Sequence, residues 1–196
     1  MNEPMSDDVW STLAARRHVA LRRLQAPGPD DAALARMMEA AAQAPDHGCL
    51  LPWRFVLIPS QRRDDLGAVF EEALVRRDPA ADADARASAR EKASHAPCLL
   101  VAILVDAPAA TIPVEEKLVS LGCALQNVLL AARALGFASG LASGGALDTP
   151  AMRRLLDLQP HERAVCFIGI GTGAAGVGKN RTPRVRPQPG QFFSSL

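Results

Sequence analysis

The stretch EEKLVSLGCALQNVLLAARALG, residues 115–136, carries the longest amphipathic pattern of the chain. Its apolar residues return every three or four positions, which places them on one face of a helix that covers a core. Gly136 comes directly after the pattern, as a glycine often does where a helix ends. The sequence therefore predicts a helix from about Glu115 to Leu135, with an apolar stripe of Leu118, Leu121, Leu125, Val128, Leu129 and Ala132.

Shorter apolar runs predict strands before and after this helix. They are rich in valine, isoleucine, leucine and aromatic residues, which favour strands. Asp30 or Asp31 is expected to cap one helix, and Thr149 another that begins at Pro150. Because helices and strands do not alternate strictly, we expect an α+β fold. The expected segments are strands at 53–58, 98–105 and 164–170, helices at 7–17, 31–44 and from 150, a polar, exposed helix pair within 61–93, and a glycine-rich loop at 138–146.

Composition and charge exclude several classes of protein. A chain of 196 residues, 48% of them hydrophobic, is expected to fold as one domain with a real core. The net charge of +1 argues against nucleic acid as a partner. No apolar run approaches the ~18 residues that cross a bilayer, so no membrane partner is expected. The polar, acidic start of the chain predicts no secretory signal, so we expect a cytoplasmic protein.

The cysteines and histidines do not have the spacing of metal ligands or of a disulfide framework. The four cysteines include no C-x-x-C pair. The four histidines are equally scattered. We therefore expect no metal site and four reduced, buried thiols.

A glycine-rich segment after the last strand invites a nucleotide-binding interpretation. Residues 171–176 match G-x-G-x-x-G, and 173–179 match the start of a Walker A loop. Both motifs need a helix immediately afterwards to hold phosphate. Pro183 and Pro187 follow instead, and Asn180 replaces the hydroxyl that binds magnesium. The segment is therefore better explained as a glycine loop that leaves a strand.

Three separated elements are more suggestive when taken together. Residues 16–18, Arg-Arg-His, offer guanidinium groups that suit phosphate oxygens. The turn at 44–48 puts polar side chains just before a buried strand, where a ligand can meet them. The small residues of 136–145 allow close backbone approach to a flat ligand. Each alone is more simply explained as ordinary surface or loop, but their order is informative.

In that order the elements resemble the nitroreductase family, and most closely its compact bacterial subgroup. The resemblance covers about residues 8–172. The family has a first helix ending in Arg-Arg-Ser, an Ala-Pro-Ser/Asp turn before Gln-Pro-Trp-Arg-Phe, and a long central helix. The corresponding stretches here are 16–18 (Arg-Arg-His), 41–47 (Ala-Ala-Gln-Ala-Pro-Asp-His), 51–56 (Leu-Pro-Trp-Arg-Phe-Val) and 121–132, with Leu-Gly-Phe at 135–137.

The resemblance implies a single FMN-binding domain over residues 1–196, with a central mixed sheet flanked by helices. It implies an intertwined homodimer with one FMN at each of two subunit interfaces. The tail, from about residue 180 to 196, is expected to reach towards the partner subunit. An arginine of that tail, Arg181, Arg184 or Arg186, is a further candidate for the FMN phosphate, and the choice among the three stays open.

The resemblance also assigns the cofactor-binding residues by position. Residues 16–18 are expected at the FMN phosphate and ribityl chain, two polar residues near the turn are expected to approach FMN, and the loop after the central helix is expected to border the isoalloxazine. No side chain is assigned as a catalytic acid or base. The candidate cofactor-binding residues are Arg16, Arg17, His18, Gln43, His47, Ala142, Ser143 and Gly144.

The implied chemistry is that of an NAD(P)H nitroreductase. FMN takes hydride from NAD(P)H and passes electrons to a nitroaromatic, quinone-like or other small electrophilic acceptor, and the cofactor carries the difficult chemistry. This sequence departs from the family at three places: His18 stands for serine, Leu51 for glutamine, and Ala142-Ser143 for the subgroup's Trp-Arg pair. The last change removes an aromatic wall and a cation.

Other functions remain open on the sequence alone. The same fold hosts flavin cleavage and dehalogenation, and a non-catalytic flavin-binding dimer is a further alternative. A nucleotide-binding protein that uses the glycine loop near residue 173 is a third. A bound yellow chromophore separates the flavoproteins from the nucleotide binder, and NAD(P)H oxidation separates an enzyme from a passive flavin carrier.

Overall fold

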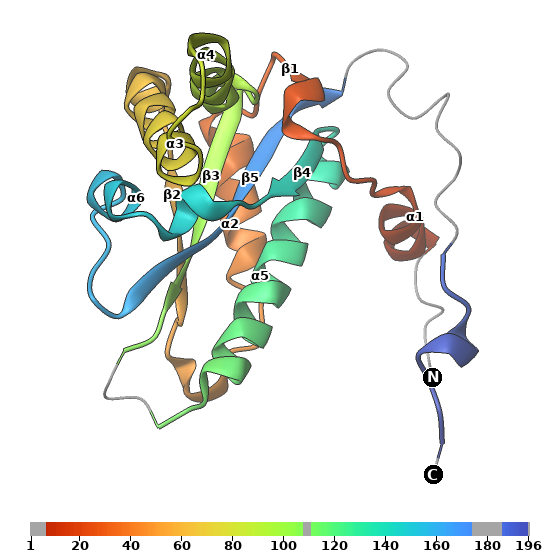
Figure 1. The fold of residues 1–196 in the computed structure, drawn as a ribbon. Helices are drawn as coiled ribbons and strands as arrows, with labels where there is room; N and C mark the ends of the chain where they lie inside the picture. The colour runs from red at the N-terminus through yellow and green to blue at the C-terminus, as the bar shows by residue number, and fades with distance from the viewer. Residues whose placement is uncertain (1–6, 108–110, 174–185, 196) are drawn as a thin grey trace.

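The computed structural model describes residues 7–107, 111–173 and 186–195. A sheet lies between two groups of helices, and α1 lies apart from these layers (Figure 1). In chain order the elements are α1 (Asp7–Ala15), β1 (Leu24–Gln25), α2 (Asp31–Ala41), β2 (Trp53–Leu57), α3 (Arg63–Arg77), α4 (Ala83–Glu91), β3 (Cys98–Val105), α5 (Val114–Ala134), β4 (Ala138–Ala142), α6 (Pro150–Leu155) and β5 (Glu162–Gly173).

Local signals account for several helix ends. Asp30 accepts a hydrogen bond from a first-turn backbone N–H of α2 at 2.8 Å, and Thr149 does the same for α6 at 3.1 Å. Gly136, with φ +87°, follows α5 in the left-handed region that glycine adopts without strain. These three signals were predicted, and the structure confirms them.

Two helices end earlier than predicted. α2 stops at Ala41, because the N–H groups of Gln43 and Ala44 bond three positions back in tight turns ahead of Pro45. α1 stops at Ala15, because the chain beyond it extends to meet β4. In both cases tertiary contacts or the coming proline override the helical pattern.

β5 lies at the centre of the sheet, whose order is β1-β5-β3-β2 with β4 also paired to β5. One edge of β5 pairs with β3, and β4 and β1 share the other edge. The four ladders within the described residues are antiparallel, and an isolated parallel bridge joins His18 to Ser139. The prediction of a loop over 138–146 is therefore wrong for 138–142, which form β4. Strand pairing there overrides the low strand preference of its small residues.

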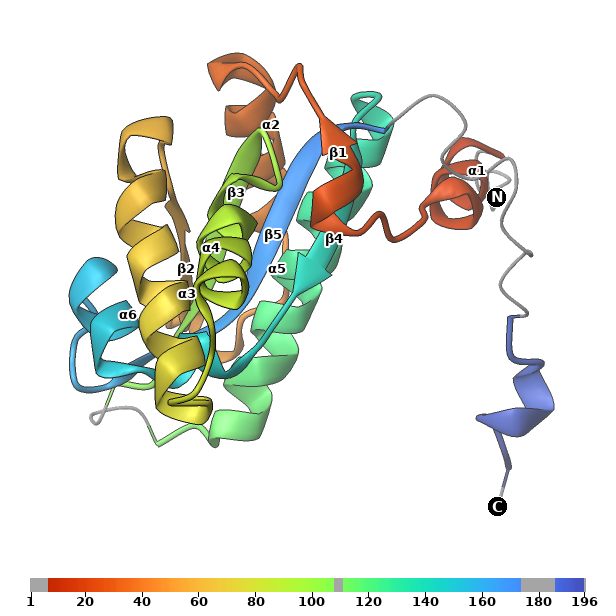
Figure 2. The same cartoon turned by 45° about the horizontal axis from the view of Figure 1, so that its top comes forward.

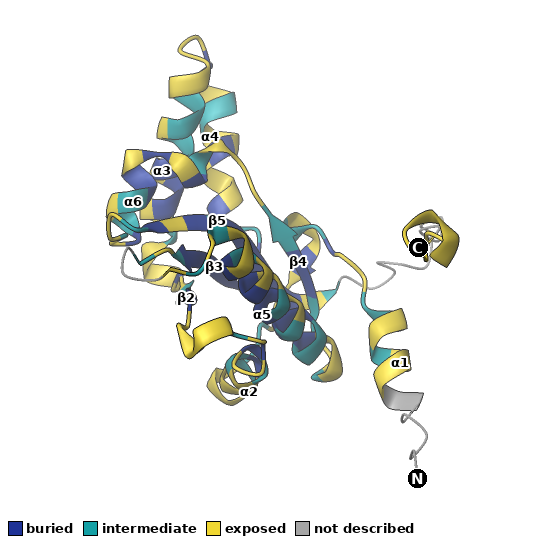
Figure 3. Ribbon diagram, turned by 90° about the horizontal axis from the view of Figure 1, so that it is seen from below, coloured by how far each residue is buried: buried dark blue, intermediate teal, exposed yellow. Residues whose placement is uncertain are grey.

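The sheet has a hydrophobic core on each face. Side chains at even positions of β3, such as Leu100 and Leu104, pack with α2 and α5. Those at odd positions, such as Val101 and Ile103, pack with α3 and α6. Both faces of the strand are thus covered, as the view from below shows (Figure 3), and this explains its unbroken apolar sequence.

The helix pair α3 and α4 is less exposed than the sequence suggested. Leu66, Val69 and Ala89 are buried, and the first two belong to the second core. Figure 2 shows α3 and α4 in front of the sheet beside α6. The expectation of an exposed pair is therefore wrong for one face of each helix. No helix within the described residues is long and apolar enough to cross a membrane.

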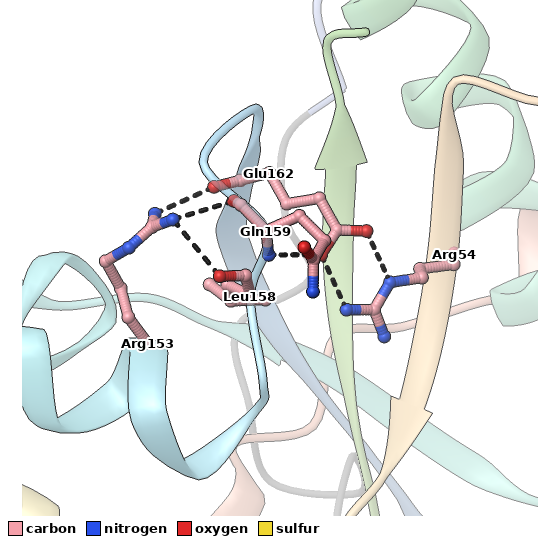
Figure 4. A network of polar contacts seen from close by, with 5 residues as sticks. All are labelled: Arg54, Arg153, Leu158, Gln159 and Glu162. Atoms are coloured by element: carbon pink, nitrogen blue, oxygen red, sulfur yellow. Dashed lines mark hydrogen bonds and ion pairs between the residues drawn. The ribbon is translucent and has the colours of Figure 1, made fainter.

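A polar network joins β2, β5 and α6 at one end of the sheet (Figure 4). Arg54 donates two hydrogen bonds to the Glu162 carboxylate, at 2.7 and 2.8 Å. The backbone N–H of Gln159 donates to the same carboxylate at 3.0 Å. Arg153 donates to the carbonyl oxygens of Leu158, Gln159 and Glu162. Because the Glu162 side chain is only 7% exposed, the carboxylate depends on these donors for the hydrogen bonds that water would otherwise supply.

We predict that Glu162→Gln lowers the free energy of unfolding by about 2 kcal/mol at pH 7, because it breaks a bidentate, largely buried ion pair. The Arg54 hydrogen bond holds the pKa of Glu162 below its usual range. The stabilisation is therefore present above about pH 4.3, the ordinary glutamate value, and is lost as pH falls from there through the lower folded pKa. Urea unfolding of both proteins from pH 3 to pH 7 measures the difference.

The exposed pair between Arg62 and Asp65 provides the control. Arg62→Gln should cost less than about 0.5 kcal/mol at every pH, since exposed pairs contribute little. Equal losses in the two variants would contradict the assignment of the Arg54–Glu162 pair as a stabilising contact.

Candidate functional site

The segment of residues 16–19 lies against the first half of β4. His18 forms a parallel bridge with Ser139, and the backbone N–H of Val19 donates to the Ser139 carbonyl at 3.0 Å. A Cβ added at Gly140 would lie 2.0 Å from the Val19 carbonyl oxygen. Only glycine permits this approach. The contact with β4 therefore sets the position of residues 16–18, the predicted phosphate-binding residues that follow α1.

The predicted loop residues Ala142, Ser143 and Gly144 line a cavity of about 880 Å³. A 3-10 helix, Leu21–Arg23, contributes a second wall just after residues 16–18. The rings of Phe70 and Phe167 meet edge-on in the lining, with centroids 5.5 Å apart. Together with Leu21 and Leu99 they give the cavity an apolar floor.

Basic side chains from three elements line the same cavity, which sequence reasoning did not detect. In sequence, the polar segment 61–93 resembles a solvated helix pair. In the structure, basic residues of this segment line the same cavity as Ala142–Gly144. Asp148 is the acidic residue of the lining. The basic residues are Arg22, Arg76, Arg77, Lys92 and His95, called here the basic wall.

Gln43 and His47 lie in the turn after α2. His47 Nδ1 lies 2.6 Å from a carboxylate oxygen of Glu116, in the first turn of α5. Asp46 accepts a hydrogen bond from the backbone N–H of Leu51 at 2.7 Å, which holds the turn closed. Gln43 and His47 both face solvent, so the turn presents polar side chains as predicted.

A single chain separates the predicted cofactor residues into two groups. His47 contacts the beginning of α5, whereas His18 bridges to Ser139, beyond its end. The helix between Glu116 and Ala134 is about 27 Å long at 1.5 Å per residue. One group therefore comprises residues 16–18 and 142–144, and the other Gln43 and His47. Of the tail arginines, Arg181 and Arg184 lie outside the described residues, and Arg186 is exposed.

The thiols offer no evident nucleophile. Cys98 and Cys166 are buried, and burial raises the pKa of Cys166 to about 11. The expectation of four buried thiols is wrong for Cys49, which is exposed in a turn with φ +51°, and for Cys123, which is only half-buried. No group of three or more potential metal ligands occurs within the described parts of the chain.

Known proteins resemble this chain in sequence. A family model described as "Nitroreductase family" matches residues 13–172. A Haemophilus influenzae protein named "Putative NAD(P)H nitroreductase" is 30% identical over 168 residues, which cover 85% of this chain and 89% of that protein.

Solved structures share the fold. A nitroreductase-like family protein from Bacillus cereus superposes with a TM-score of 0.81 at 19% identity, covering 100% of this chain and 98% of its own. The FMN-dependent nitroreductase NfnB from Mycobacterium smegmatis, solved in complex with NADPH, gives a TM-score of 0.77 at 14% identity, covering 98% and 100%. The family match over most of the chain and the similarity to the Haemophilus protein lead to one conclusion: this chain belongs to the nitroreductase family.

Proposed function

We propose that this protein is an FMN-dependent oxidoreductase that uses NAD(P)H to reduce a small electrophilic acceptor, such as a nitroaromatic or a quinone. The observation that carries the proposal is the apolar-floored cavity beside β4 in a chain of the nitroreductase family. Related proteins support it, since one is named an NAD(P)H nitroreductase and another is an FMN-dependent enzyme solved with NADPH.

The cavity fits the chemistry of a flavin. Its volume falls within the range of roughly 300–1,000 Å³ that is usual for cofactor and small-molecule sites. The apolar floor suits a flat aromatic ring, and the small side chains of residues 142–144 allow that ring to approach the backbone closely. Arg16 and Arg17, which follow α1 and precede the cavity-lining Ala20 and Leu21 in the chain, are suited to a phosphate group.

Bound FMN would take two electrons from NAD(P)H and deliver them to the acceptor. The protein's own residues orient the ring, hold the phosphate and limit water around the reacting atoms. The described cavity offers no buried acid or base that would need to act on the substrate.

We further propose that the site is completed by a second copy of the chain. Two predicted groups that lie at opposite ends of α5 can meet the same ligand only if they come from different subunits. Exposed apolar side chains near both groups supply surface for such a contact: Val9, Trp10, Leu13, Leu50, Leu51 and Val119. We therefore expect a homodimer with two equivalent sites, each shared between the subunits.

The first prediction here concerns the cofactor. Protein incubated with FMN and then desalted should keep the visible flavin bands, and NADPH or NADH should bleach them without air. Denaturation should release FMN, identified by chromatography. A colourless protein that cannot be loaded would contradict the proposed function.

Complementation between variants tests the shared site. Arg16→Ala/Arg17→Ala and Gln43→Ala/His47→Ala should each retain little FMN as pure proteins. When the two are co-expressed, mixed dimers carry one intact site and one doubly altered site. Roughly one quarter of the wild-type FMN content should then return, as random pairing of subunits requires. No recovery in mixed dimers, isolated by two different affinity tags, would show that each site lies within one chain.

The contact at Gly140 provides a separate test of where residues 16–18, the predicted phosphate-binding residues, lie. Gly140→Ala should reduce FMN retention at least tenfold, because its Cβ displaces the Val19 backbone and with it residues 16–18. Gly173→Ala is the matched control, since its Cβ would meet only an ordinary contact at 3.5 Å. Retention is measured by equilibrium dialysis, and thermal melting of both variants monitors the fold. Equal FMN affinity in the two variants would contradict the role given to this contact.

A further inference from the structure

The basic wall holds four cationic side chains and a histidine, and the proposed function leaves it unexplained. Arg22 comes from the 3-10 helix before β1, Arg76 and Arg77 from the last turn of α3, and Lys92 and His95 from the segment between α4 and β3. Cations that converge from three elements on one cavity mark a preference for negative charge.

The basic residues of the wall are unpaired in the described part of the chain, although Asp148 also lines the cavity. Within the described residues, none of these five side chains makes an ion pair or a hydrogen bond, in contrast to Arg90 of α4, which pairs with Glu71 of α3. The dipole of α3 favours Arg76 and Arg77 at its C-terminal end wherever they point. It does not explain why Arg22 and Lys92 face the same space from other elements.

The wall is close to the apolar floor. Phe70, in the floor, and Arg77, in the wall, lie on one helix and are separated by about 10 Å along its axis. With the flavin ring on the floor, an acceptor held against that ring brings a substituent within reach of a long, flexible arginine. Residues 16–18, which resemble the family's phosphate-binding residues, do not line this cavity, so they leave the wall available for a different anion.

We propose that the basic wall binds the anionic group of the electron acceptor, so that the protein prefers aromatic acceptors carrying a carboxylate over neutral acceptors of the same shape. This inference rests on the proposed function, because it names the substrate class of that same site. It assigns to Arg76 and Arg77 a role in substrate selection rather than in electron transfer.

The test compares 4-nitrobenzoate with 4-nitrobenzamide, which have similar shape and differ in charge. The FMN-loaded protein is reduced without air and mixed with each acceptor, and kcat/KM is obtained for both at low ionic strength. In Arg76→Glu/Arg77→Glu the ratio of the two constants should fall about fivefold from the wild-type ratio, as expected for two exposed charge contacts. Added salt should lower the wild-type ratio as well, because it screens these contacts.

Arg23→Glu/Arg154→Glu is the matched control. Both arginines are exposed, neither lines the cavity, and the net charge changes by the same amount. The control should keep the wild-type ratio. A fall of equal size in the control would show a general field effect and overturn the proposal, as would an unchanged ratio in Arg76→Glu/Arg77→Glu.

Binding without turnover gives an independent readout. Isothermal titration of the oxidised, FMN-loaded protein should show benzoate binding more tightly than benzamide, and Arg76→Glu/Arg77→Glu should remove the difference. Loss of FMN from this variant would mean that the wall holds the cofactor's own phosphate, which overturns the proposal. If wild-type protein retains no FMN, the proposed function fails. The same titration on flavin-free protein then tests anion binding by the basic wall separately. Tighter binding of benzoate than of benzamide supports that binding, and equal binding of the two overturns it.

Discussion

The ladder between β3 and β5 is the interaction on which the rest of the structure depends. Both strands are covered on both faces, so a slip of one residue would exchange the side chains of the two cores. The second edge of β5 then carries β4 and β1, and β4 in turn receives the backbone of His18 and Val19. The candidate site is thus built on the β4 edge of β5, and the buried pairing of β5 with β3 sets the position of that edge.

Much of this fold could be predicted from local sequence, because its signals are local. The caps at Asp30 and Thr149, the glycine after α5 and the apolar runs of β2, β3 and β5 act within a few residues. β4 could not be predicted, since its small residues are selected by close approach to β5 and to Val19, and these contacts come from distant parts of the chain. The same holds for the ends of α1 and α2.

The candidate site follows a similar division. The order of the Arg16-Arg17-His18, Gln43–His47 and Ala142–Gly144 elements pointed to a family and to a cofactor without any knowledge of the fold. The basic wall escaped detection because a cation on a polar helix has the same sequence signature whether it faces a cavity or bulk water. Ala142 and Ser143, where the subgroup has Trp-Arg, leave one side of the cavity with small neutral side chains. Its positive charge therefore comes from other elements, from Arg22 and the α3–α4 region.

The place of β5 in the sheet also has a consequence for how the chain acquires its structure. β5 is the last strand of the sheet in chain order, yet it joins β3 to both β4 and β1. As the polypeptide leaves the ribosome, β2 and β3 emerge early with one edge of β3 and an apolar face still uncovered. The closing contacts, such as Val105 with Glu162, link residues far apart in the chain and carry the loop-closure entropy that slows folding. A chain without β5 would therefore present an unpaired strand edge and apolar surface, the features that make folding intermediates aggregate.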